Sequence, residues 1–445
     1  MKIRFSPVLL VVVPVICLCL VVAGKLVYDF PPVHDRLAWR VDNWRAQIKY
    51  ALNPPEEVVF LPQEQVAQAA EETLQTNQIT PSPTFTVTAI QTRPVLTPTL
   101  TPSPTPAPTA TLLPTEIRLA GVKYEDQHNR WNYCGPANLS MALTFWGWDG
   151  NRDVVGAYVK PEEKDKNVMP YEMGDFVETQ TTGLQVVVRP GGDIDLIRRM
   201  VVAGFPVLTE KGYYEYDYNG KLGWMGHYQY VTGYDDAKGV LVVQDTYNDG
   251  PNHEISYAEF REGWRSFNYI FLVVYPQERE AEVLTLLGNY ADVDWANRHA
   301  LETAQSEAQT LAGLNQFFAW FNAGSSHVNL REYQDAATAY DESFRLYAQM
   351  SKDEMRPFRM MWYQTGPYWA YYYTGRYQDV LGLANTTLND TISEPVLEES
   401  LYWRGLAKAA LGDTEGAIKD LRDSLIWHPG FTPSLDQLQQ MGVSP

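Results

Sequence analysis

A stretch rich in threonine and proline divides this chain and limits what can fold on either side of it. Between Thr80 and Thr115, 36 residues contain 9 prolines and 12 threonines, and Arg93 is the only charged residue among them. Such a segment cannot bury a core, and it favours an extended polyproline II backbone. We therefore expect residues 80–116 to form a disordered stalk, with a short region before it and the folded domains after it.

An apolar run lies close to the N-terminus. Residues 7–24 carry no charge, and Lys2 and Arg4 precede them. This length is at the short end of the ~17–25 residues that span a bilayer. The pattern predicts a transmembrane signal anchor at 7–24 behind a short cytoplasmic segment at 1–6; a cleaved secretory signal is the alternative. We expect a single-pass protein at the cell membrane with its folded domains outside the cytoplasm, or a secreted protein if the segment is cleaved.

The charge balance narrows the range of partners. The chain carries 35 lysines and arginines against 54 aspartates and glutamates, a formal net charge of −19. Nucleic acids attract proteins that present clustered basic residues. We therefore expect no nucleic-acid partner.

Changes in periodicity divide the rest of the chain. Residues 25–79 read as a partly helical juxtamembrane region, and residues 117–277 as a domain of mixed helices and strands. From there to the C-terminus the pattern is helical, with connecting helices expected at 278–315 and repeats at 316–445. The sequence thus predicts an α+β domain followed by an all-α region.

The last repeat resembles the tetratricopeptide pattern. Within Gly405–Pro429, six residues occupy the small, turn and helix-packing positions of that pattern: Gly405, Gly412, Ala417, Leu421, Ser424 and Pro429. Two looser copies precede it, around Gly324–Leu346 and Tyr368–Leu388. Corresponding positions in the three copies are Ala336, Val380 and Ala417, which are 44 and 37 residues apart. The resemblance predicts a curved stack of helix pairs that binds a protein partner.

One thiol stands apart from the others. Cys17 and Cys19 lie in the apolar run, so Cys134 is the only cysteine in the folded sequence. It opens the motif CGPA (134–137), and an apolar helical pattern follows, in which Pro136 suits a first turn. At a helix N-terminus, free amides and the helix dipole favour a thiolate and can receive an oxyanion. We predict that Cys134 is a nucleophile; a buried structural thiol is the alternative.

A thiolate nucleophile needs a proton carrier, which is usually histidine. His227 lies in a predicted strand, and Val240–Asp245 reads as a second strand behind a turn near Asp236. A turn centred there would make His227 and Asp245 direct partners across an antiparallel hairpin. Asp245 is therefore expected to orient His227. The alternative for Asp245 is an ordinary turn former at a strand end.

Other polar residues near the motif have weaker assignments. Gln127, seven residues before Cys134, is the candidate side-chain donor of an oxyanion hole, with an exposed loop glutamine as the alternative. His253 lies in a polar loop and is expected at the surface, while spacing alone does not place His128. The tyrosine-rich segment from Glu210 to Gly226 reads as a loop that forms either a wall of the substrate cleft or a solvated tip.

Taken together, these residues resemble the bacteriocin-processing cysteine peptidases, and most closely their stand-alone C-39-like branch. The resemblance rests on CGPA at 134–137, on Gly226-His227-Tyr228 and on Asp245 beside a polar turn, and it covers about residues 118–275. It implies a papain-like fold with Cys134 as nucleophile, His227 as base, Asp245 as orienter and Gln127 as oxyanion donor. The family's glutamine more often stands where this chain has His128.

The resulting hypothesis is a membrane-tethered extracytoplasmic cysteine peptidase that acts on a peptide or protein substrate. Two other functions stay open: a catalytically silent papain-like scaffold for protein binding, and an amidase on cell-wall peptides, because the same triad serves both hydrolases. The chain has no G-x-x-x-x-G-K-[ST] loop, so the leader-peptide processing of the family's transporters is not implied. It also lacks an HExxH motif and a spaced Cys/His quartet, so neither a metal nor another cofactor is expected.

Overall fold

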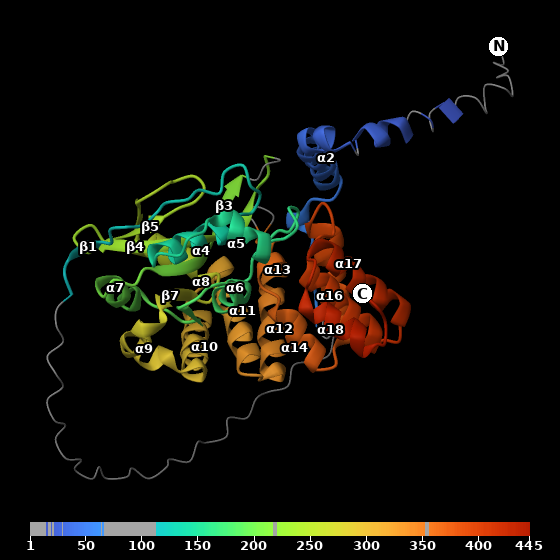
Figure 1. Cartoon of the computed structure of the whole chain (residues 1–445). Coiled ribbons are helices and arrows are strands. Elements are labelled where there is room, and N and C mark those ends of the chain that lie inside the picture. Colours follow the sequence, from blue (N-terminus) through green and yellow to red (C-terminus); the bar gives the residue numbers. More distant parts are fainter. Residues whose placement is uncertain are drawn as a thin grey trace, which may run out of the picture.

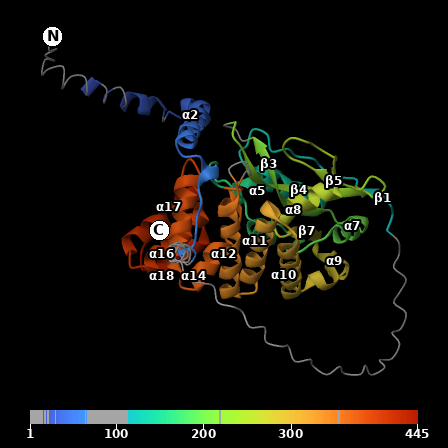
Figure 2. The same cartoon turned by 180° about the vertical axis from the view of Figure 1, so that it is seen from behind.

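The computed structural model describes residues 15, 16, 19, 22–28, 30–63, 65, 113–216, 220–351 and 356–445. An α+β region built around one sheet lies beside a helical C-terminal region. Both views show α10, α11, α12 and α14 side by side, with α16, α17 and α18 grouped beyond them (Figures 1 and 2). The N-terminal helix α2 (Pro31–Leu52) stands near α17 (Thr414–Trp427).

The sheet is antiparallel throughout. Its strands follow the order β2-β7-β3-β4-β5-β6, and the short β1 also pairs with β4. Valine, leucine and aromatic residues dominate these segments, as expected for strands that are covered on both faces. The strands are β1 (Glu116–Arg118), β2 (Leu184–Arg189), β3 (Val207–Tyr216), β4 (Leu222–Asp235), β5 (Val240–Gln244), β6 (His253–Ser256) and β7 (Phe271–Pro276).

Helices cover both faces of the sheet. Because successive strand residues point to opposite faces, Leu272 and Val274 of β7 join one core, and Phe271 and Val273 join the other. The first core includes the helix that begins at Cys134. The helices on that side are α4 (Cys134–Phe145), α5 (Arg152–Val159) and α6 (Pro170–Gln180). The helices on the other side are α7 (Ile194–Val202), α8 (Tyr257–Arg265) and α9 (Glu280–Leu287).

The C-terminal region is helical, as predicted. After α10 (Val293–Thr310), the helices pack as successive pairs, α11 with α12, α14 with α15 and α16 with α17. Buried aromatic side chains such as Phe321, Tyr340 and Tyr371 fill the space between them. Their bounds are α11 (Gly313–Asn329), α12 (Tyr333–Gln349), α13 (Met360–Tyr363), α14 (Gly366–Tyr373), α15 (Tyr377–Thr386), α16 (Glu398–Ala410), α17 (Thr414–Trp427) and α18 (Thr432–Gln440).

The segment after α2 lies along the helical region. The backbone N–H of Gln63 donates to Asp379 Oδ1 at 2.8 Å, and Arg356 Nη1 donates to the carbonyl of Glu56. The Phe60 ring meets the ring of Phe344 edge to face, with 5.1 Å between centroids. This part of the chain therefore packs against the helices, although the sequence predicted only a partly helical juxtamembrane region.

The predicted localisation needs correction. Among the described residues, no helix is long and apolar enough to cross a membrane. The 22-residue helix α2 has the length, but charged residues recur along it: Arg40, Asp42, Arg45 and Lys49. The prediction of a single-pass protein at the cell membrane is therefore withdrawn. Much of the predicted anchor at 7–24 and nearly all of the predicted stalk at 80–116 lie outside the described residues.

Candidate active site

Cys134 is the first residue of α4, so the predicted helix begins at the predicted place. Other helices of this domain have an N-cap residue whose side chain accepts a hydrogen bond from an amide of the first turn. These N-cap residues are Asn151 for α5, Asp193 for α7 and Ser256 for α8. The residue before α4, Tyr133, makes no such bond. The first amides of α4 are therefore open to the thiol, and the Gly135 N–H donates a hydrogen bond to it.

A buried asparagine ties the helix to the sheet. Asn138 Nδ2 donates to the carbonyl of Cys134 and to the carbonyl of Tyr228 on β4, both at 2.9 Å. Asn138 is fully buried, and so is Tyr228. These two hydrogen bonds hold the start of α4 against β4 at Tyr228. They therefore place Cys134 beside His227, which precedes Tyr228 on β4. Asn138 directly follows the CGPA motif, and the sequence analysis assigned no role to it.

His227 and Asp245 face each other inside the domain. His227 Nε2 lies 3.0 Å from Asp245 Oδ2, and both side chains are almost completely buried. The Asp245 carboxylate also accepts from Gln229 Nε2 at 2.8 Å and from the backbone N–H of Tyr247 at 2.9 Å. Both oxygens of the carboxylate thus accept hydrogen bonds. Because Nε2 of His227 faces Asp245, the other ring nitrogen is the one that can bond to the thiol.

The predicted register of this hairpin is wrong. Tyr230 pairs with Gln244, so Asp245 follows the last residue of β5 and has no direct Cα partner in His227. The turn comes after Asp235, later than assumed, and a bulge between Val231 and Gly233 shifts the ladder. The two side chains meet diagonally instead, at a reach that long side chains can cover.

Neighbouring charges and hydrogen bonds stabilise the ionised forms of Cys134, His227 and Asp245. Burial alone would raise the pKa of the Cys134 thiol, but the hydrogen bond and charge of His227 outweigh it and lower that pKa. Burial likewise disfavours the imidazolium, yet Asp245 raises the pKa of His227 to about 9. Against the effect of burial, His227 and Gln229 hold the pKa of Asp245 well below its ordinary value. The arrangement therefore favours a thiolate–imidazolium pair at neutral pH.

Gln127 lines the same pocket as Cys134 and His227. Its Oε1 accepts from Thr246 Oγ1 at 2.9 Å, and its backbone N–H donates to the Thr246 carbonyl at 2.8 Å. Because the carbonyl end of the amide is held, Nε2 is the end that can donate into the pocket that Gln127 lines. His128 is exposed beside Asp126, and His253 lies near Asp249, so neither joins the site.

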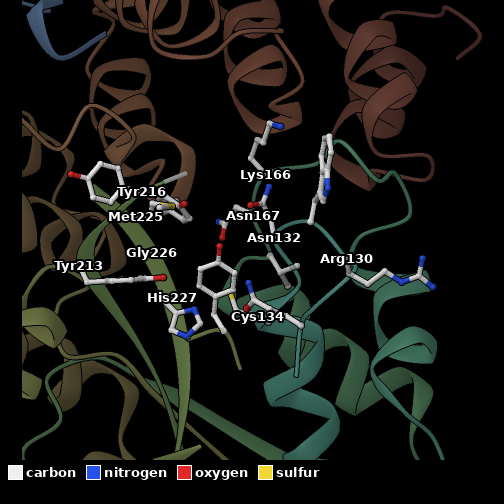
Figure 3. A pocket seen from close by; sticks show the side chains of 16 residues that line it. Arg130, Asn132, Cys134, Lys166, Asn167, Tyr213, Tyr216, Met225, Gly226 and His227 are labelled. Carbon is white, nitrogen blue, oxygen red and sulfur yellow. The ribbon is translucent and has the colours of Figure 1, made fainter. Parts of the chain in front are cut away.

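The cysteine and histidine line a pocket of about 180 Å³ (Figure 3). One wall comes from the tyrosine-rich segment, which is a β-hairpin extension of β3 and β4 and not the predicted loop. Its Tyr213, Tyr216 and Met225 face the pocket, and the Tyr213 ring lies 5.5 Å from the His227 ring. The segment therefore forms a cleft wall, which was one of the two predicted alternatives.

Two contributions to the pocket escaped the sequence analysis. Tyr363 comes from α13 of the helical region and packs on Gly226, so the helical region completes the pocket. Lys166, Asn167 and Val168 come from the loop between α5 and α6. Neither segment carries a motif, and Tyr363 is more than 200 residues away from Cys134 in the sequence. Only the three-dimensional packing brings them there.

A buried carboxyl group also lies near the thiol. Glu210 on β3 pairs in register with Tyr228, and it is 2% exposed. Burial and then the negative charge of Cys134 raise the pKa of Glu210 well above its usual range. Both effects favour the neutral form of Glu210, so this carboxyl group competes less with Asp245 for the charge of His227.

Residues 119–270 match the model of a family described as "Peptidase_C39 like family". The predicted C-39-like resemblance of this region is thereby confirmed. No curated protein matches the chain. The chain contains a C39-like, papain-like α+β domain with a helical C-terminal region, which supports a peptidase whose substrate is a peptide or protein.

Two solved structures show a distant likeness. A protein from Bacillus anthracis, described as a C39-like peptidase, is 15% identical; the match covers 36% of this chain and 97% of that one, with a TM-score of 0.29. The peptidase domain of Streptococcus ComA, a bi-functional ABC transporter involved in a quorum-sensing pathway, is also 15% identical. That match covers 33% of this chain and 93% of the other, with a TM-score of 0.25. Neither likeness is close enough to bear on activity.

Proposed function

We propose that this chain is a cysteine peptidase in which Cys134 is the nucleophile, His227 the proton carrier and Asp245 the group that orients His227. The observation that supports it best is the buried contact of 3.0 Å between His227 and Asp245, with Cys134 hydrogen-bonded to His227 at a helix N-terminus. In this proposal the domain at 117–277 is catalytic, and residues 316–445 form a repeat region. Residues 278–315 are the helices that connect the two.

The proposed reaction follows from these positions. The Cys134 thiolate attacks the substrate carbonyl carbon, and the developing oxyanion accepts hydrogen bonds from Gln127 Nε2 and a free amide at the start of α4. The His227 imidazolium then gives its proton to the leaving amine as the C–N bond breaks. Water, deprotonated by the neutral imidazole, attacks the thioester and releases the acid and the thiolate. Asp245 keeps the ring oriented through both steps.

One experiment distinguishes the proposed peptidase from the two alternatives, the amidase and the catalytically silent scaffold. The purified full chain is incubated with a library of extended peptides, and new termini are identified by mass spectrometry, with Cys134→Ala as the control. We expect internal peptide bonds to be cut by the wild type alone. Release of only side-chain or cell-wall amides indicates the amidase. No wild-type product, together with no labelling of Cys134 by a thiol-directed activity probe, indicates the silent scaffold.

The proposal extends to the helical region, which we interpret as a tetratricopeptide array that binds extended peptides. The turns inside its three described helix pairs adopt left-handed backbone at Arg331, Gly375 and Gly412, with φ of 61°, 77° and 90°. Each turn stands five residues before a fully buried residue of the second helix: Ala336, Val380 and Ala417. This recurrence supports one repeated structural unit.

The array already holds a segment of its own chain, residues 58–63, which follows the short 3-10 helix at Pro55–Glu57. Phe60 and Gln63 contact α12, α14 and α15 through Phe344, Tyr371 and Asp379. A synthetic peptide of residues 56–65 should therefore bind the full-length variant Phe60→Ala more tightly than the wild type, because the mutation weakens the competing internal segment. Fluorescence anisotropy measures this. Equal or absent binding to both proteins contradicts peptide binding at this surface.

A further inference from the structure

A second cluster of buried titratable groups lies where the C39-like domain meets the helical region. Asp165 belongs to the loop between α5 and α6, and Glu172 to the first turn of α6. Glu398 and Glu399 open α16, and His428 follows α17. All four carboxylates are buried, with exposed fractions of 1% for Asp165, 7% for Glu172, 1% for Glu398 and 9% for Glu399.

The chain supplies too little positive charge for this cluster. His428 Nδ1 lies 3.2 Å from Glu398 Oε1 and 3.7 Å from Glu172 Oε1, so one ring nitrogen faces two carboxylates. Lys160 is buried nearby, but its ammonium group donates to the carbonyls of Glu162 and Glu163. Lys166 is the other neighbouring cation. Four carboxylates thus face two ammonium groups and an imidazole, and a buried carboxylate without a compensating charge is unfavourable.

Two oxygen atoms in the cluster are free to bind a ligand. Asp165 Oδ2 and Glu398 Oε2 are buried and have no hydrogen-bond partner among the described residues. One oxygen of Asp165, one of Glu398 and a ring nitrogen of His428 lie within 4.8 Å of one another. Ligands held at about 2.2 Å from one ion are at most about 4.4 Å apart, so a small shift would close these atoms around it.

We propose that Asp165, Glu398 and His428 bind one divalent transition-metal ion, with Zn²⁺ the best match. An imidazole together with carboxylates suits Zn²⁺ better than Ca²⁺ or Mg²⁺, which prefer oxygen ligands alone. The ion supplies the positive charge that the cluster lacks. A surface pocket lined by Glu172 and His428 gives it a route from solvent.

This site would join the two regions at the edge of the active-site pocket. Asp165 immediately precedes Lys166, Asn167 and Val168, which line the pocket. Its carbonyl also accepts from Asn132 Nδ2 at 3.4 Å, two residues before Cys134. Bound metal would therefore hold one wall of the pocket and raise kcat/KM, a consequence that rests on the proposed peptidase function.

The test uses the full-length chain with Cys17→Ser, Cys19→Ser and Cys134→Ala, so that no thiol competes for the ion. The protein is stripped with a chelator and titrated with ZnCl₂ by calorimetry, and its Tm is recorded with and without ZnCl₂, CaCl₂ or MgCl₂. Because catalysis is absent, the result is independent of the peptidase proposal. We expect one Zn²⁺ per chain and a higher Tm with Zn²⁺ than with the other two ions.

The variants decide whether this cluster is the site. Glu398→Gln and His428→Gln, checked for folding by circular dichroism, should lose both the Zn²⁺ binding and the Tm shift. The matched control is His327→Gln, which alters a second, more exposed group of ligand-type residues, His327, Glu332 and Asp335. It should keep both. No binding by the parent chain, a preference for Ca²⁺ or Mg²⁺, or retention of binding by both cluster variants would overturn the proposal.

Discussion

The active site and the domain junction both bury several titratable groups, but they balance charge in opposite ways. At the active site, Asp245 faces His227 and His227 faces Cys134, so each charged form has a partner. At the junction, burial and then the charges of neighbouring carboxylates raise the pKa of Glu398 and of Glu399 well above the usual range.

This difference relates each cluster to its proposed role. A chain of alternating charges keeps a nucleophile and a proton carrier ready for reaction without an external ion. A surplus of buried carboxylates requires protons or a cation from outside the chain. Single substitutions should therefore abolish chemistry at the first cluster, whereas at the second they should change cation binding.

Among single substitutions at the active site, replacing His227 should have the largest effect on catalytic activity. His227→Ala removes the proton carrier and the counter-charge of the thiolate, and we expect kcat to fall by about 10⁴-fold or more. Steady-state peptide hydrolysis measures it. The matched control His253→Ala changes a histidine outside the pocket and should leave kcat unaltered. Equal losses in both variants would contradict the assignment of His227.

Asp245→Asn should come next, with kcat lower by about 10²- to 10⁴-fold, because the amide no longer holds the imidazolium. It should also change the pH profile. The reactive pair needs a protonated ring, so activity is expected to decline as pH rises through the His227 pKa of about 9. Asp245 raises that pKa, so the asparagine variant should lose activity at a lower pH. An unshifted alkaline limb argues that Asp245 is only a strand-end residue.

Gln127→Ala tests the oxyanion donor. Because a donor aimed at the transition state affects the chemical step, we expect kcat to fall by about 10²- to 10³-fold with KM nearly constant. His128→Ala is the neighbouring control, since that side chain is exposed and does not line the pocket. If His128→Ala is the more damaging change, the oxyanion donor has been placed on the wrong residue.

Tyr216→Ala should have the smallest effect. This side chain lines the pocket but is 61% exposed, so it contributes contact area to the substrate and nothing to proton transfer. KM should rise by roughly three- to tenfold while kcat stays constant, which is the pattern of lost ground-state binding. Tyr158→Ala, at an exposed tyrosine away from the pocket, is the control. A drop in kcat without a change in KM would remove Tyr216 from the cleft wall.

Local patterns predicted much of this molecule. The CGPA motif placed Cys134 at a helix start, and β-branched and aromatic residues located the strands that carry His227 and precede Asp245. The register was wrong because it depends on a bulge and on where the turn falls, which residue counting does not reveal.

The residues that the sequence analysis missed depend on packing between distant segments. Tyr363 reaches the pocket only because α13 lies against β4, and Asp165 meets Glu398 only where two domains join. No spacing rule connects positions so far apart in the chain. The membrane assignment rested on the composition of residues 7–24 alone, and among the described residues no helix is long and apolar enough to cross a membrane.

The central claim, a thiolate at Cys134 maintained by His227, has one direct test. Cys17 and Cys19 are replaced by serine in the full-length chain, and the rate of alkylation of Cys134 by iodoacetamide is followed against pH by mass spectrometry. We predict that reactivity persists well below the pKa of a free thiol, about 8.5, and that His227→Ala moves the midpoint up toward that value. A midpoint near that of a free thiol in both proteins would contradict the proposed active site.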